Sequence, residues 1–137
     1  MSPPSDSVGE TIVVGVDASP ESMAALLWAF RLSSSNDAKV LAVHAEGLLE
    51  EGAYVPRVDV EALIAGTLAG LDFGGSVTSL VEPGHPTETL LRVAERTRAG
   101  HIVVGHRGVG DTGADIGSTA LMLVSRAAVP VTVVRSV

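Results

Sequence analysis

A glycine-rich segment is the part of this chain whose residue types and spacing are best suited to chemistry. It holds five glycines within residues 105–117 and ends next to Ser118. Glycine permits positive φ angles and lets backbone N–H groups come close to a ligand. The segment follows an apolar run and precedes a predicted helix, whose first N–H groups attract anions. The pattern fits a phosphate cradle, in which Ser118 donates its hydroxyl to a phosphate oxygen or caps the helix. A plain glycine-rich surface loop is the alternative.

Asp17 is the second candidate, because it directly follows the first apolar run of the chain. Its carboxylate can accept hydrogen bonds from a ribose hydroxyl or from the amino group of a base. In the alternative interpretation, Asp17 is a turn residue that bonds to its own backbone.

Several other kinds of site are excluded by the sequence. A Walker loop needs Gly-Lys-Ser/Thr, but the only lysine is Lys39, and residues 15–19 hold one glycine where a dinucleotide fingerprint needs three. The chain has no cysteine, shows no Ser/His/Asp nucleophile elbow and offers no convincing general base for ATP hydrolysis. The histidines lie on separate segments without the i, i+4 spacing of a helical zinc site, and His106 is the one expected to face the candidate site. We therefore predict neither a metal site nor an enzyme.

The elements that must position these residues alternate along the chain. Short apolar runs rich in β-branched residues predict five strands, at 11–16, 40–43, 77–81, 102–104 and 131–134. Helical spacing between them predicts a parallel sheet with helices on both faces. The stretches at 12–16, 40–43 and 102–104 carry no polar residue and belong in the centre, whereas the runs at 77–81 and 131–134 contain Thr or Ser and belong at the edges. This gives the strand order 3-2-1-4-5. Ligands bind such sheets at the carboxyl ends of the strands where the winding reverses, here between the first and fourth strands.

Apolar spacing predicts the helices in more detail. Ser19 caps the first helix, with Pro20 in its first turn. The fourth helix, from about 118 to 128, is apolar over most of its circumference, so we expect it to be covered on more than one side. Residues 46–58 are predicted to be a mobile surface connection. The apolar stripes of the first three helices are Met23, Leu26, Leu27 and Phe30; Val60, Leu63, Ile64, Leu68 and Leu71; and Leu90, Leu91 and Ala94.

Composition sets the class of protein. The chain has 137 residues, 46% of them hydrophobic and 18% charged, which predicts one domain over residues 11–137 after a polar, flexible tail at 1–10. The net charge of -7 opposes binding to nucleic acid or to an anionic membrane. The chain contains neither a membrane-spanning apolar run nor a signal peptide, so the expected location is cytoplasmic.

Taken together, these motifs resemble the universal stress protein family over the span from Thr11 to Val134. The resemblance is carried by Ile-Val-Val-Gly-Val-Asp-Ala-Ser-Pro at 12–20, Val-Val-Gly-His-Arg-Gly at 103–108, Gly-Ser at 117–118 and the last strand. Gly-His-Pro at 84–86 also fits the family's Gly-x-Pro. The resemblance implies a parallel sheet in the order given above and a homodimer formed through the edge of the fifth strand. It also implies a division of members into those that bind ATP and those that do not.

The resemblance further implies roles for particular residues. Asp17 would contact the adenosine, with Ala45 and Val104 beside the base. Gly105 and Gly108 would pass close to the ribose and phosphates. The residues that would hold the phosphates are Gly117, Ser118 and Thr119.

The glycine motif departs from the family pattern Gly-x2-Gly-x9-Gly-Ser/Thr. Only eight residues separate Gly108 from Gly117, so the loop is one residue short. Asp111 and Asp115 add negative charge beside a site for a triphosphate, which Arg107 or a bridging Mg²⁺ can offset.

Two hypotheses about function follow. In the first, the protein binds ATP or a related adenine nucleotide at the switch point, alone or together with Mg²⁺, and acts as a sensor or regulator in a stress response. In the second, it is a homodimeric interaction scaffold of the same family that does not bind nucleotide.

Overall fold

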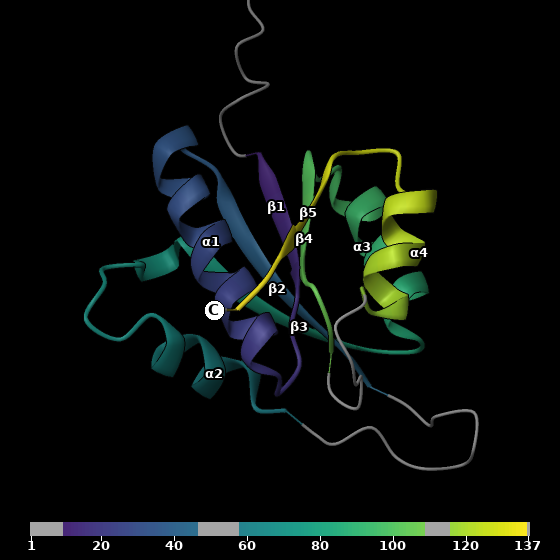
Figure 1. Cartoon of the computed structure of the whole chain (residues 1–137). Helices are drawn as coiled ribbons and strands as arrows, with labels where there is room; N and C mark the ends of the chain where they lie inside the picture. Colours follow the sequence, from purple (N-terminus) through teal and green to yellow (C-terminus); the bar gives the residue numbers. More distant parts are fainter. Residues whose placement is uncertain (1–9, 47–57, 109–115, 137) are drawn as a thin grey trace, which may run out of the picture.

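A computed structural model describes residues 10–46, 58–108 and 116–136, which form a sheet with helices on both faces (Figure 1). The predicted tail therefore lies almost wholly outside the described residues, as do most of the predicted mobile connection and both Asp111 and Asp115. The elements are β1 (Thr11–Gly15), α1 (Pro20–Asn36), β2 (Lys39–Glu46), α2 (Val60–Thr67), a short 3-10 turn η2 (Gly74–Ser76), β3 (Val77–Pro83), α3 (Pro86–Thr97), β4 (His101–Gly105), α4 (Ser118–Arg126) and β5 (Val131–Val134).

The sheet has the predicted order, β3-β2-β1-β4-β5, with every neighbouring pair parallel. Val13 of β1 lies opposite Leu41 of β2 on one side and Ile102 of β4 on the other. The three strands free of polar residues in the predicted runs are indeed central, and β3 and β5 are the edges. The strand limits were less accurate, because β2 extends to Glu46 and β3 to Pro83, whereas β1 ends at Gly15.

The core has two halves, one on each face of the sheet. Helices α1 and α2 cover one face and α3 and α4 the other, as Figure 1 shows. Successive residues of β1 alternate between them, since Ile12 and Val14 pack under α1 and Val13 packs under α3. Both faces of the central strands are thus buried, which is why those strands read as continuous apolar runs.

The start of α1 agrees with the prediction from sequence. Ser19 is the N-cap, and its hydroxyl accepts a hydrogen bond from the N–H of Ser22 at 3.2 Å. Pro20 occupies the first turn, where its missing N–H costs nothing. At the other end, Asp37 adopts the left-handed conformation with φ of 54° and closes the helix.

Three helix predictions were wrong. The second helix stops at Thr67, so Leu71 lies beyond it and is 44% exposed. Gly70, at a φ of +83°, lies in the turn that follows the helix. The fourth helix is not covered on more than one side, because Leu121, Met122 and Val124 are exposed. Its N-cap is Gly117 and no side chain caps it, so the capping role proposed for Ser118 was also wrong.

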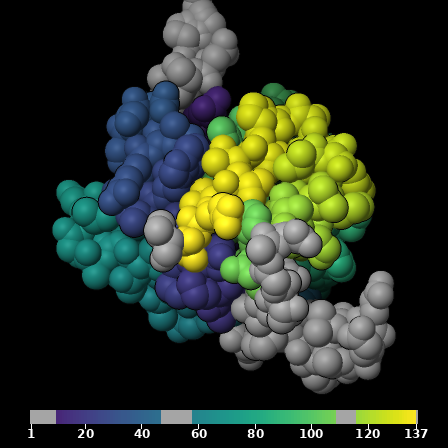
Figure 2. Space-filling model, viewed as in Figure 1, coloured from purple at the N-terminus to yellow at the C-terminus, as the bar shows by residue number. Residues whose placement is uncertain are grey.

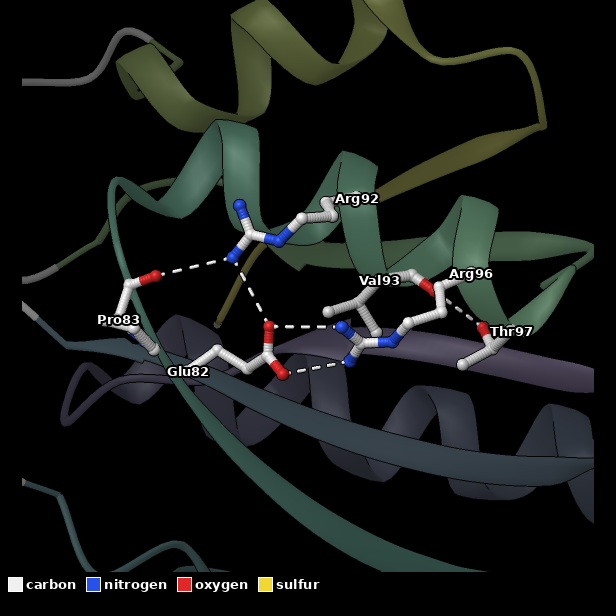
Figure 3. Close-up of polar contacts among 6 residues, drawn as sticks. All are labelled: Glu82, Pro83, Arg92, Val93, Arg96 and Thr97. Carbon is white, nitrogen blue, oxygen red and sulfur yellow. Dashed lines mark hydrogen bonds and ion pairs between the residues drawn. The ribbon is translucent and has the colours of Figure 1, made fainter.

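An ion-pair cluster ties the edge strand β3 to α3 (Figure 3). Glu82 accepts hydrogen bonds from Arg92 at 3.3 Å and from Arg96 at 2.9 Å, and Arg92 also donates to the carbonyl of Pro83 at 3.4 Å. The hydrogen bond from Arg96 lowers the pKa of Glu82 below its ordinary value of 4.5. The stabilisation from this cluster is therefore complete above that ordinary value and is lost as the pH falls through the lowered pKa.

Candidate functional site

The switch point of the sheet brings together the carboxyl ends of β1 and β4. β1 continues into Val16, whose N–H donates to the carbonyl of Val43 at 2.9 Å. β4 continues into His106, whose N–H donates to the carbonyl of Val134 and whose carbonyl accepts from the N–H of Gly117, both at 2.7 Å. The second of these bonds holds the start of α4 beside the end of β4.

Asp17 lies in the turn between β1 and α1 and is half-buried. Its Oδ1 accepts a hydrogen bond from the N–H of Ser19 at 2.8 Å, and its own N–H donates to the hydroxyl of Ser22 at 2.8 Å. The turn interpretation of Asp17 is therefore confirmed for this oxygen. A contact with adenosine stays a prediction.

Gly105, the first glycine of the motif, has a packing role that the sequence did not reveal. A Cβ built on it would lie 2.7 Å from the Cβ of Glu21 and 2.8 Å from the carbonyl carbon of Glu21. Only glycine lets β4 approach the first turn of α1 this closely. The presence of glycine at this position is thus accounted for without a ligand.

An ion pair joins the two sides of the switch point. Arg107, which follows β4, contacts the carboxylate of Glu21 on α1 at 3.4 Å, and the Glu21 side chain is only 11% exposed. From the sequence, Arg107 was expected to offset the negative charge of Asp111 and Asp115. Within the described residues, it forms an ion pair with Glu21. The ion pair fastens the start of the glycine-rich segment to α1.

The start of α4 offers anion-binding groups. Gly117 is buried, Ser118 is exposed and Thr119 is half-buried. Because no side chain of the described residues caps this helix, we expect its first N–H groups to be able to bind an anion. This arrangement matches the phosphate end of the predicted site.

The two residues predicted beside the base are Ala45, near the carboxyl end of β2, and Val104, near the carboxyl end of β4. Ala45 and Val104 are 8% and 4% exposed, and Val104 packs in one cluster with Leu90 of α3. Gly15 lies beside both Leu90 and Val104, because a Cβ built on it would be 2.8 Å from Leu90 Cδ1 and 3.2 Å from Val104 Cγ1. The apolar wall formed here thus faces the first turns of α3.

Three buried polar side chains lie near the carboxyl edge, and two of them, Thr87 and Thr89, were not singled out from the sequence. His44, Thr87 and Thr89 are 1%, 2% and 0% exposed. His44 Nδ1 bonds to the carbonyl of Val16 at 2.9 Å, but its Nε2 has no partner among the described residues, and neither does the hydroxyl of Thr87 or of Thr89. Buried polar groups nearly always have partners, so these atoms favour a polar ligand or water at this edge. The one available signal was the position of Thr87 on the apolar stripe of Leu90 and Ala94.

His85 and His101 make contacts that serve the fold. His85 is the N-cap of α3, where its Nδ1 accepts from the N–H of Thr87 at 3.3 Å. His101 lies at the amino end of β4, away from the switch point, with Nε2 2.7 Å from the hydroxyl of Thr132 and its ring 6.0 Å from that of Trp28. Burial lowers the pKa of His101. Within the described residues, no group of His, Asp and Glu side chains has the arrangement of a metal site.

Comparison with known proteins identifies the family of this chain. The family model described as "Universal stress protein family" matches residues 9–135, and the chain belongs to this family. None of the curated proteins matches it.

The fold is similar to that of several solved structures. The universal stress protein UspA from Lactobacillus plantarum is 21% identical, with a TM-score of 0.73 over 93% of this chain and 99% of that one. A universal stress protein from Archaeoglobus fulgidus in complex with dAMP is 19% identical, with a TM-score of 0.63 over 93% and 98%. A family protein from Arabidopsis thaliana with AMP bound is 21% identical, with a TM-score of 0.62 over 93% and 92%.

Among the residues that the structure describes, no helix is both long and apolar enough to cross a bilayer.

Proposed function

We propose that this protein binds ATP or a related adenine nucleotide at the switch point between β1 and β4. The observation that carries the proposal is the uncapped start of α4, which a 2.7 Å hydrogen bond from Gly117 to His106 holds beside the end of β4. Unsatisfied N–H groups at a helix start are suited to phosphate. The complexes of similar proteins with AMP and dAMP support the same ligand class.

In this proposal each end of the ligand has its own contacts. Gly117, whose own N–H donates to the carbonyl of His106, positions the start of α4, and the N–H groups and hydroxyls of Ser118 and Thr119 hold the phosphates. Gly105 and Gly108 lie close to the ribose. Asp17 contacts the adenosine through its carboxylate. Ala45 and Val104 form the apolar wall beside the base. With a triphosphate, Mg²⁺ held by Asp111 and Asp115 would balance the charge.

The role that follows is regulatory. The protein would act in the cytoplasm as a single-domain sensor of adenine nucleotides in a stress response, by binding the nucleotide and not by transforming it. Its net charge of -7 argues against nucleic acid and anionic membranes as partners.

A thermal-shift titration with AMP and ATP, with and without Mg²⁺, tests the binding. Nucleotide at a hundredfold excess over its Kd is expected to stabilise the fold by about 2.7 kcal/mol. Ser118→Ala is expected to weaken the binding of AMP by at least about tenfold and to leave the binding of adenosine unchanged, since a hydrogen bond to a charged group contributes roughly 1.5–3 kcal/mol.

The matched control is Ser125→Ala, which removes an exposed hydroxyl from the last turns of the same helix, where it donates to the carbonyl of Leu121 at 3.1 Å. This variant is expected to bind AMP like the wild type. If millimolar nucleotide causes no shift and freshly purified protein releases no nucleotide, the binding proposal is rejected.

We also propose that the protein is a homodimer through β5, and in the alternative function this dimer is an interaction scaffold without nucleotide. β5 is an edge strand with β4 as its one neighbour in the sheet, and Figure 2 shows it at the surface between α1 and α4. The exposed apolar side chains of α4 (Leu121, Met122 and Val124) extend this surface. An uncovered edge of this kind invites pairing with a second strand.

Val133→Pro is expected to convert the dimer to a monomer in light scattering. The carbonyls of Pro130 and Val134 accept from β4, so the backbone of Val133 faces away from β4. Proline at this position removes an outward donor and leaves the β4 pairing in place. The melting temperature of the variant checks that it still folds. A wild-type chain that is monomeric at micromolar concentration would refute the dimer, whatever the nucleotide result.

A further inference from the structure

Thr87, near the start of α3, has a buried hydroxyl for which the fold gives no use. The residue is 2% exposed, and its Oγ1 has no hydrogen-bond partner among the described residues. Neither the sequence motifs nor the family resemblance assigned it a role. A hydroxyl left without a partner in a buried place costs free energy, so a polar ligand or a bound water is expected to complete it.

The packing of α3 shows which part of the molecule this hydroxyl faces. Leu90 follows Thr87 by one helical turn on the same face of α3 and packs against Gly15 and Val104. α3 begins at the carboxyl edge of the sheet, where the N–H of Gly84 donates to the carbonyl of Glu46 at 2.8 Å. Thr87 therefore lies closer to that edge than Leu90 does, on the side of the sheet where Val104 packs.

Thr89 provides a contrast on the same helix. It is 0% exposed and its hydroxyl also has no partner among the described residues. Its Oγ1, however, lies 3.1 Å from the position that a Cβ would take on Gly84. Thr89 thus faces the turn between β3 and α3 and not the wall formed by Leu90 and Val104.

We infer that the hydroxyl of Thr87 hydrogen-bonds to the base of the bound nucleotide and helps to select it. This inference rests on the proposed nucleotide binding, and it adds a polar contact to a wall that otherwise consists of Ala45, Val104 and Leu90. The edge of a base offers both donors and acceptors, and a threonine hydroxyl can serve either.

Thr87→Val tests the inference, because valine keeps the shape of threonine and removes the hydroxyl. Calorimetric titration is expected to show that the affinities for adenosine and for AMP fall by the same factor, about fivefold for the loss of one neutral hydrogen bond. The melting temperature of the free protein is expected to stay the same or rise, since an unsatisfied buried group is removed. Thr87→Ser, which keeps the hydroxyl, is expected to retain most of the affinity.

Thr89→Val is the matched control, and it is expected to leave both affinities unchanged. Wild-type affinity in Thr87→Val would overturn the inference while nucleotide binding stands. A loss with AMP but not with adenosine would place the hydroxyl at the phosphate, which also overturns it. If the wild-type chain binds neither compound, the proposed function fails and this inference fails with it.

Discussion

Alanine at position 105 is expected to lower the free energy of unfolding by about 3 kcal/mol, the upper part of the usual range for overpacking. The added Cβ would lie 2.7 Å from the Cβ and 2.8 Å from the carbonyl carbon of Glu21. Neither atom belongs to the flexible end of a side chain, so α1 and β4 must separate to make room. Urea unfolding followed by circular dichroism measures the loss.

Gly66→Ala is the control for this substitution. Gly66 lies within α2, and a Cβ on it meets nothing within 4 Å. Alanine is the better helix former, so this variant is expected to gain about 0.5–1 kcal/mol. A Gly105→Ala protein as stable as the wild type would mean that α1 does not approach β4 as closely as described.

Leu90→Ala is expected to cost about 3 kcal/mol, because Leu90 is only 3% exposed and its removal leaves a cavity beside β1. Gly15→Ala is expected to cost about 1–3 kcal/mol alone, since its Cβ would lie 2.8 Å from Leu90 Cδ1. Chemical denaturation of the two single variants measures these losses.

The double variant should lose less than the sum of the two losses, because the methyl group at position 15 enters the space that Leu90 vacates. A double-mutant cycle measures this coupling. Strictly additive losses would show that the two side chains do not share one space.

The order of the strands could be predicted because a strand that is buried on both faces of the sheet has a continuous apolar sequence. The predicted runs at 40–43 and 102–104 carry no polar residue, whereas the edge runs contain Thr or Ser. The start of α1 was equally accessible, since capping by Ser19 and the first-turn Pro20 depend on neighbouring residues alone. Such local rules, together with the family resemblance, were sufficient for the fold.

Predictions that depended on what packs beside an element were less successful. The apolar circumference of α4 indicated burial, but Leu121, Met122 and Val124 are exposed, because the main contacts of the helix with other described elements are those with α3 and β5. The side chain of Ser118 looked like a cap, yet the chain enters the helix at Gly117. Sequence spacing does not reveal the neighbours of an outer helix.

The candidate site shows the same division. Spacing located the glycine-rich segment correctly between β4 and α4, but it did not reveal that Gly105 is needed for contact with Glu21. The hydroxyl of Thr87, which has no partner in the part of the chain that the structure describes, could not be predicted either, because its surroundings depend on the packing of α3 against the sheet. Both features arise from contacts between segments far apart in the chain.

The position of β1 between β2 and β4 has a consequence for how the chain acquires its shape. Ile12 pairs with Val40 on one side and with His101 on the other, so the second partner is about 60 residues farther along than the first. During synthesis, β1 and β2 can associate early, but the other side of β1 stays open until β4 has left the ribosome. Pairings between such distant segments slow folding, and until β4 is available they leave one edge of β1 unpaired and prone to aggregation. Nascent chains that stop before β4 should therefore depend on chaperones far more than the finished protein does.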